Sequence, residues 1–234
     1  MSPLLTIPRR FNGPLDSGNG GYAAGLVAEF VSGQAQVSLR SPVPLDRPLD
    51  VVTDDDGAAR VLDGDTLVAE ARPTAAVALD VPAPVSADAA RTAMDGYRGL
   101  DTGPFHRCFV CGRAREDSFG VFAGRVEGRD VVASTWTPPA WAADEQGNTR
   151  PELIWAVLDC PTYFASYIDE DLQLSFLASF AVRIDAPVVA GREHVVIAWP
   201  IGRDGRKLRS GSAVMTAEGE TLAVADALLI EPRA

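Results

Sequence analysis

Apolar and polar positions follow the same order in two stretches of the chain. In the first stretch, a glycine-rich run at 18–22 precedes an apolar segment at 23–31 with helical spacing, which Ser17 or Asn19 can cap. Short alternating runs then predict four strands, separated by Gly-, Pro- and Asp-rich turns, at 35–39, 49–53, 58–62 and 66–71.

The second stretch repeats this order. An apolar segment at 150–168 has the length of a helix, and it is followed by four runs typical of strands, at 174–184, 194–200, 207–216 and 221–230. An additional strand pair is expected before this helix, at 120–125 and 130–136. A helix followed by an antiparallel meander, present twice, predicts an α+β fold in which two sheets join edge to edge.

We therefore expect two units, 1–80 and 105–234, separated by a linker at 81–104. The linker region is rich in Ala, Pro and Asp, and residues 86–94 can form a short capped helix. Its apolar content indicates a segment that packs across the fold, since a free tether would be more polar.

Composition narrows the classes of function. Apolar residues make up 47% and charged residues 23%, as in an ordinary globular protein. No apolar run is long enough to cross a membrane, and we see no signal peptide. The net charge of −11 disfavours nucleic acid as a partner, and three cysteines fit a reducing cytoplasm better than a disulfide framework.

Asp159 is the most informative single residue, because it is the only ionisable side chain other than thiols and phenols between Leu153 and Ile168. A carboxylate in an apolar helix costs free energy unless it is paired or functional, and burial raises its pKa toward that of a useful base. The alternative is a structural carboxylate that caps a neighbouring backbone amide, and Pro161 makes local irregularity expected.

The run Gly18-Asn19-Gly20-Gly21-Tyr22 is the second candidate. Glycines at a helix start allow backbone amides to approach a ligand, and the helix dipole favours developing negative charge. This is the geometry of an oxyanion hole, although a tightly turning loop would have the same composition.

These motifs and the doubled pattern resemble the hotdog-fold thioesterase superfamily in its tandem, double hotdog form. The stretch VLDCPTYFA resembles the central-helix segment of tandem acyl-CoA thioesterases, with Leu158 where a serine usually stands. The glycine run resembles a His-Gly-Gly helix start, with Asn19 in the histidine position. The resemblance implies one composite site, with Asn19, Gly20 and Gly21 from the first unit and Asp159 from the second.

The resemblance also implies a hydroxyl on the strands that follow the second helix, for which Ser179 or Ser175 is available. The amide that such enzymes place near Leu228 is missing, so Thr162 and Tyr163 are nearer substitutes. Contacts to the substrate are expected from four side chains: Tyr22, Trp155, Thr162 and Tyr163.

A possible half of a zinc knuckle is the string His106-Arg-Cys108-Phe-Val-Cys111-Gly, and Cys160 could complete its ligand set. A second Cys-x-x-Cys pair is normally required, and the string also resembles the CFVCG opening of single-unit hotdog proteins. We therefore expect no metal.

The function expected from the resemblance is hydrolysis of acyl-CoA or acyl-carrier thioesters, with coenzyme A as part of the substrate and no other cofactor. The partner is a small acyl thioester, no nucleic acid or membrane is expected, and a homodimer is compatible with the fold. The rivals are a non-catalytic acyl-thioester-binding protein and an enoyl hydratase or dehydratase that would depend on His194 or His106. The arginines at 203–209 and at 9–10 could bind the phosphates of coenzyme A, or they could be ordinary solvent-exposed surface residues.

Overall fold

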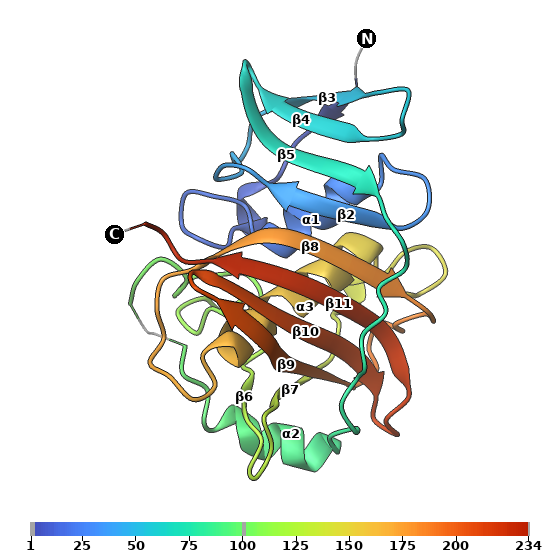
Figure 1. Cartoon of the computed structure of the whole chain (residues 1–234). Coiled ribbons are helices and arrows are strands. Elements are labelled where there is room, and N and C mark those ends of the chain that lie inside the picture. The colour runs from blue at the N-terminus through green and yellow to red at the C-terminus, as the bar shows by residue number, and fades with distance from the viewer. Residues whose placement is uncertain (1–2, 100–101, 234) are drawn as a thin grey trace.

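A single 11-stranded antiparallel sheet organises the chain in a computed structural model that describes residues 3–99 and 102–233. The strand order is β1-β3-β4-β5-β2-β8-β11-β10-β9-β7-β6 (Figure 1). β2 and β8 pair through three residues of each strand, and this short ladder joins the N-terminal and C-terminal halves of the sheet.

The N-terminal half contains five strands and the helix α1. Its elements are β1 (Leu4–Leu5), α1 (Gly20–Ala28), β2 (Ala35–Leu39), β3 (Leu49–Thr53), β4 (Ala59–Asp63) and β5 (Thr66–Pro73). The four strands expected here are confirmed to within two residues, and β1 is additional. Asn19, one of the two expected caps, is the N-cap of α1, so both glycines that follow lie inside the helix, which ends at Ala28 before the end of the apolar segment.

The C-terminal half contains six strands around the longer helix α3. Its elements are β6 (Gly124–Arg125), β7 (Val132–Trp136), α3 (Pro151–Ser166), β8 (Phe176–Ile184), β9 (His194–Asp204), β10 (Lys207–Thr216) and β11 (Thr221–Ile230). The strands β10 and β11 coincide with the expected ranges, whereas β6 and β7 are shorter than expected. Two short 3-10 helices, Arg9–Phe11 and Ala140–Ala142, precede α1 and α3.

Pro161 lies inside α3 and has no amide hydrogen to donate to the preceding turn. Side-chain hydroxyls bind carbonyls nearby: Ser212 of β10 donates to the Leu158 oxygen at 2.7 Å, and Thr162 donates to the Asp159 oxygen at 2.6 Å. The carbonyls around the proline are therefore hydrogen-bonded although the region is buried.

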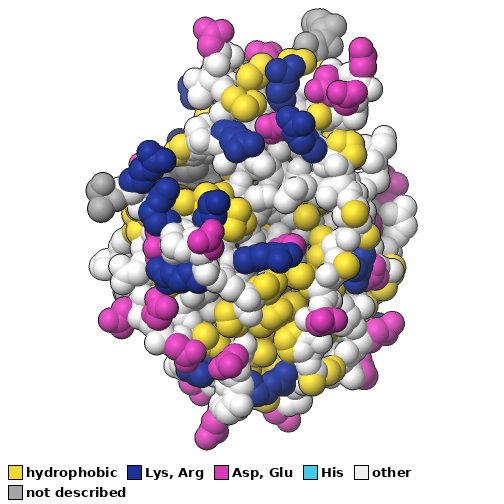
Figure 2. Space-filling model, viewed as in Figure 1, with side chains coloured by type: hydrophobic (Ala, Val, Ile, Leu, Met, Phe, Trp, Pro, Cys, Tyr) yellow, Lys and Arg dark blue, Asp and Glu magenta, His cyan; other side chains and the backbone are white. Residues whose placement is uncertain are grey.

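A segment without helix or strand, residues 74–86, leads from β5 to α2 (Ala87–Met94) along the C-terminal half of the sheet (Figure 1). Val77 and Val85 of this segment and Ala90 of α2 pack with outward-facing side chains of the strands, including Ile197 and Met215. Figure 2 shows that apolar side chains remain visible on the lower part of this face. The helices α1 and α3 lie on the opposite face, so the sheet has apolar contacts on both sides.

No helix of residues 3–99 and 102–233 has the length and apolar character needed to span a membrane.

Candidate functional site

The helices α1 and α3 run antiparallel and touch along α1, and two glycines allow this contact. A Cβ atom on Gly21 would lie 2.5 Å from the carbonyl oxygen of Trp155 and 2.6 Å from Cβ of Asp159. A Cβ atom on Gly25 would lie 2.7 Å from Cα of Glu152. The backbones are thus too close for any larger residue at either position.

This contact brings Asp159 to the first turn of α1. Its Oδ2 atom accepts a hydrogen bond of 2.8 Å from the backbone amide of Gly21. The side chain is buried, and burial raises the pKa of Asp159 to about 7, a shift opposed by the Gly21 amide and assisted by the charge of Cys108. The Asp159 carboxylate on α3, in the C-terminal half of the chain, therefore contacts the start of α1 in the N-terminal half. The helix dipole favours negative charge there.

Asn19 fixes this helix start. Its Oδ1 atom accepts a hydrogen bond of 2.9 Å from the amide of Tyr22, which makes it the N-cap of α1. Its Nδ2 atom faces the sulfurs of Cys108 and Cys160 at 3.8 and 3.7 Å. Asn19 thus connects the start of α1 to the loop before β6 and to α3.

The amides at the start of α1 are not equivalent. Those of Gly21 and Tyr22 are bound by Asp159 and Asn19, whereas the Gly20 amide has no acceptor among the described residues. Leu39 and Leu177 border Gly20, with side-chain carbons 3.1–3.2 Å from where its Cβ would lie. Of these three amides, that of Gly20 is therefore the donor left unpaired among the described residues.

The structure does not bring Ser179 to this place. On β8, Phe180 belongs to the core that contains the helices, while Ala181 belongs to the core under residues 74–94. Because side chains alternate along a strand, Ser179 shares the outer face with Ala181, away from α1 and α3. Ser175 is buried ahead of the start of β8.

The remaining substrate-contact candidates make ordinary packing or helix contacts. Trp155 packs edge-on against Phe180 with ring centres 5.6 Å apart, and the hydroxyl of Tyr163 donates to the carbonyl of Gln173. Tyr22 stacks on Phe11 at 4.1 Å, so its ring anchors the loop before α1. The Thr162 hydroxyl is used inside α3, as described above.

The two histidines lie apart from the helix start. His194 is buried in β9, where its Nε2 atom contacts the carbonyl of Val189 at 3.0 Å, and burial lowers its pKa. His106 binds the carbonyl of Gly103 through Nδ1. Neither histidine makes a hydrogen bond to Asp159 among the described residues, so an acid–histidine pair of the kind a dehydratase uses is not formed there.

All three cysteines converge beside Asn19, which the spacing of Cys108 and Cys111 alone did not reveal. The Sγ atoms of Cys108, Cys111 and Cys160 all lie within 4.8 Å of one another. Cys160 comes from α3 and the other two from the loop before β6, so only the fold unites them.

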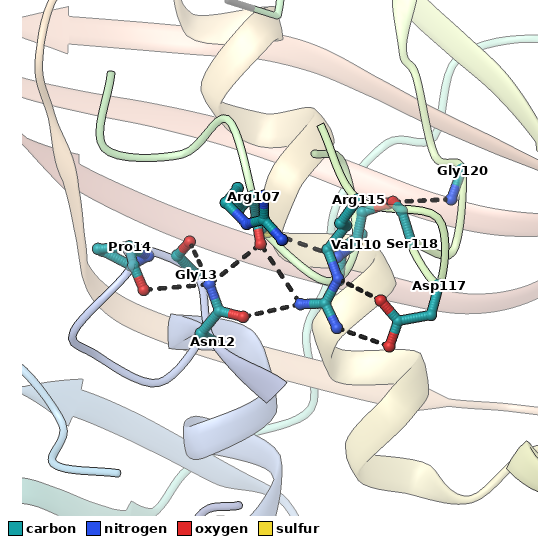
Figure 3. A network of polar contacts seen from close by, with 10 residues as sticks. Asn12, Gly13, Pro14, Arg107, Val110, Arg115, Asp117, Ser118 and Gly120 are labelled. Carbon is teal, nitrogen blue, oxygen red and sulfur yellow. Dashed lines mark hydrogen bonds and ion pairs between the residues drawn. The ribbon is translucent and has the colours of Figure 1, made fainter. Parts of the chain in front are cut away.

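A polar network that no local sequence pattern indicates connects the loop before α1 to the loop around residue 110 (Figure 3). Arg115 donates to Oδ1 of Asn12 at 2.7 Å and forms a bidentate ion pair with Asp117. The side-chain amide of Asn12 donates to the carbonyl of Arg107 at 3.0 Å. The network borders a surface hollow of about 340 Å³ that is lined by Arg9, Arg10, Asn12, Leu15, Arg107, Arg115 and Asp117.

The basic hairpin at 203–209 is largely neutralised by acidic neighbours. Arg203 pairs with Glu170 and Glu231, and Arg209 pairs with Asp226 (Figure 2 shows basic and acidic groups interspersed). In the arginine-lined hollow, Arg115 and Arg9 also pair with acids, Asp117 and Asp46, whereas Arg10 and Arg107 form no ion pair among the described residues.

Comparison with known proteins identifies the fold of the chain. No protein-family model matches the sequence, and no curated protein matches it. The tesB protein of Mycobacterium avium subspecies paratuberculosis aligns over 98% of this chain and 92% of its own, with TM-score 0.61 and 12% identity. A candidate thioesterase from Novosphingobium aromaticivorans aligns over 98% and 95%, with TM-score 0.60 and 15% identity. The chain therefore has the hotdog fold of these structures along its whole length.

Proposed function

We propose that the chain is a tandem of two hotdog units that hydrolyses acyl thioesters of coenzyme A or of a carrier protein at one composite site. The observation that carries this proposal is the 2.8 Å contact between Oδ2 of Asp159 and the Gly21 amide at the start of α1. The contact supports a composite site, because Asp159 of α3 lies at the start of α1, a helix end of the kind that binds anions.

The reaction needs an activated water and a place for the negative charge on the thioester oxygen. Asp159 takes a proton from water, and the water oxygen adds to the carbonyl carbon. The Gly20 amide and the α1 dipole stabilise the resulting oxyanion. When the tetrahedral intermediate collapses, the carbon–sulfur bond breaks, and Asp159 returns the proton to the departing thiolate. The products are a carboxylic acid and a free thiol.

The arginine-lined hollow supplies a place for the phosphates of the carrier. Arg115 is held by Asp117 and Asn12, and Arg10 packs its guanidinium over the ring of Trp141 at 4.2 Å. Such held guanidinium groups suit phosphate oxygens, because less side-chain freedom is lost on binding. The hollow adjoins the loop that leads into Asn19, whose amide donates to the carbonyl of Phe11.

A second candidate function is binding of an acyl thioester without turnover. It is favoured by one observation: Asp159 is only 8% exposed and its hydrogen bond occupies the Gly21 amide, as a purely structural cap would. The two candidates differ in the fate of the bound thioester.

The test measures free thiol released from a panel of acyl-CoA chain lengths by the wild type and by Asp159→Asn. The asparagine keeps an oxygen that can accept from the Gly21 amide, so the helix contact is retained while the base is lost. Hydrolysis by the wild type that the substitution removes supports the thioesterase. Binding of acyl-CoA with equal affinity by both proteins, and no turnover by either, supports the second function. A blank without substrate corrects for Cys108, Cys111 and Cys160.

A further inference from the structure

The three cysteines form a cluster whose geometry fits a metal ion. Their Sγ atoms lie within 4.8 Å of one another, and those of Cys108 and Cys160 are 3.7 Å apart. Around a tetrahedral zinc ion with Zn–S bonds of ~2.3 Å, two sulfurs lie ~3.8 Å apart. The sulfurs therefore need little movement to share one ion.

We propose that Cys108, Cys111 and Cys160 bind one Zn²⁺ ion as three thiolates, with water as the fourth ligand. Thiolate ligands select soft ions such as zinc over magnesium or calcium. The proposal concerns a metal site and does not rest on the proposed hydrolysis.

The loop that carries Cys108 and Cys111 folds into a tight turn around the Cys108 sulfur. The amide of Val110 donates to Sγ of Cys108 at 3.4 Å, and the amide of Gly112 donates to the Cys108 carbonyl at 2.8 Å. A Cβ atom on Gly112 would lie 2.5 Å from the amide nitrogen of Cys108, so only glycine permits this turn. The turn aims both sulfurs at Cys160.

Donors around the cluster stabilise negative sulfur. The Nδ2 group of Asn19 faces both Cys108 and Cys160, and the Val110 amide points at Cys108. Zinc binds cysteine as the thiolate, so metal binding would release thiol protons.

The number of protein ligands follows from the composition of the cluster. His106, the remaining ligand that the sequence suggested, is bonded to Gly103 and is not part of the cluster. Since no fourth His, Cys, Asp or Glu joins the three sulfurs among the described residues, we assign the fourth position of a tetrahedral ion to water.

The experiment uses the full chain, reduced and stripped of metal, and follows titration with Co²⁺ as a spectroscopic stand-in for Zn²⁺. We expect one equivalent to produce a thiolate-to-cobalt charge-transfer band and the visible bands of a tetrahedral ion. One equivalent of Zn²⁺ should bleach these bands and protect the thiols from a thiol reagent. Absence of the bands, or thiols that react equally fast with and without Zn²⁺, overturns the proposal in the wild-type protein itself.

Variants assign the ligands. Cys160→Ser should weaken Zn²⁺ binding by more than the 10–100-fold that loss of an outer partner costs, and Asn19→Ala should weaken it by about 10-fold. His106→Ala is the matched control and should bind as the wild type does. Circular dichroism of the metal-free proteins shows whether each variant is folded. A folded Cys160→Ser protein with wild-type affinity overturns the assignment.

Discussion

The two helix starts on the inner face of the sheet differ in what they offer to an anion. α1 begins with Asn19 as cap and two glycines, and the carboxylate of Asp159 lies against it. α3 begins with Arg150, whose side chain makes no cap hydrogen bond, and with Pro151, which has no amide hydrogen. The carboxylate of Glu152 also occupies its first turn and pairs with Arg150 at 2.8 Å.

This difference explains why two similar halves of the chain would form a single anion-binding site. A proline and an acid at the start of α3 remove a donor and add a charge that repels a developing oxyanion. On α1, the acid nearest to this second helix start is Glu29, the C-cap residue. Burial and then the charge of Glu152 raise the pKa of Glu29, so the second place brings two carboxylates together.

The largest expected effect is the difference in kcat between substitutions of the two acids, Asp159 and Glu29. If the proposed hydrolysis is correct, Asp159→Asn lowers kcat by about 10²–10⁴-fold, the range over which a general base contributes. Glu29→Gln should change kcat by less than about twofold, because a change distant from special features has little effect. Steady-state thiol release measures both. Equal losses in the two variants would show that the helix starts do not differ in the way described.

The next effect concerns the helix contact. Gly21→Ala should lower the free energy of unfolding by about 1–3 kcal/mol, because its Cβ meets the backbone of Trp155 and the helices must separate. Gly20→Ala is the matched control: its neighbours are flexible leucine side chains, and alanine favours the helix by about 1 kcal/mol. Chemical denaturation measures both variants, and a Gly21→Ala protein as stable as Gly20→Ala would contradict the close contact.

A smaller effect tests the cap that α1 has and α3 lacks. Asn19→Ala removes the acceptor of the Tyr22 amide and should cost about 1 kcal/mol. Asn19→Ser keeps a capping oxygen and should cost only a few tenths of a kcal/mol. Both proteins are compared by thermal unfolding in reduced, metal-free form. Equal destabilisation by alanine and serine would assign the role of Asn19 to its contacts with sulfur.

The smallest effect is a pH dependence at the second helix start. A carboxyl group with a pKa raised by folding stabilises below its unfolded value, near 4.3, and loses that contribution as pH rises through the folded value. Glu29→Gln should therefore be more stable than the wild type at pH 7, by a few tenths of a kcal/mol because solvent screens a partly exposed group, with no gain at pH 4. Glu218→Gln, an exposed acid, is the control in melting experiments at both pH values.

Much of the fold could be predicted because its periodic patterns are local. The strands β10 and β11 are apolar runs bounded by clear turns, and Asn19 and Ser86 each cap the helix they precede. The glycine run was expected at the start of α1, and the closeness of α3 explains why glycines occupy this helix although glycine disfavours helices.

The candidate site was predictable only in part, since its distances depend on how the halves meet. The sequence indicated Asp159 and the glycine run, but nothing local specifies which amide the carboxylate meets. Ser179 was a plausible hydroxyl, yet the alternation of β8 turns it to the outer face. The convergence of Cys160 with Cys108 and the network of Arg115 with Asn12 arise from packing between segments distant in the chain.

The short ladder between β2 and β8 has a consequence for synthesis of the protein. β2 leaves the ribosome long before β8, so the first half is made with an unpaired strand edge and with α1 not yet covered by α3. Open edges recruit other strands, and contacts between distant segments form slowly. The nascent chain is therefore most prone to aggregation before β8 emerges, and a fragment ending before α3 would remain in that exposed condition permanently.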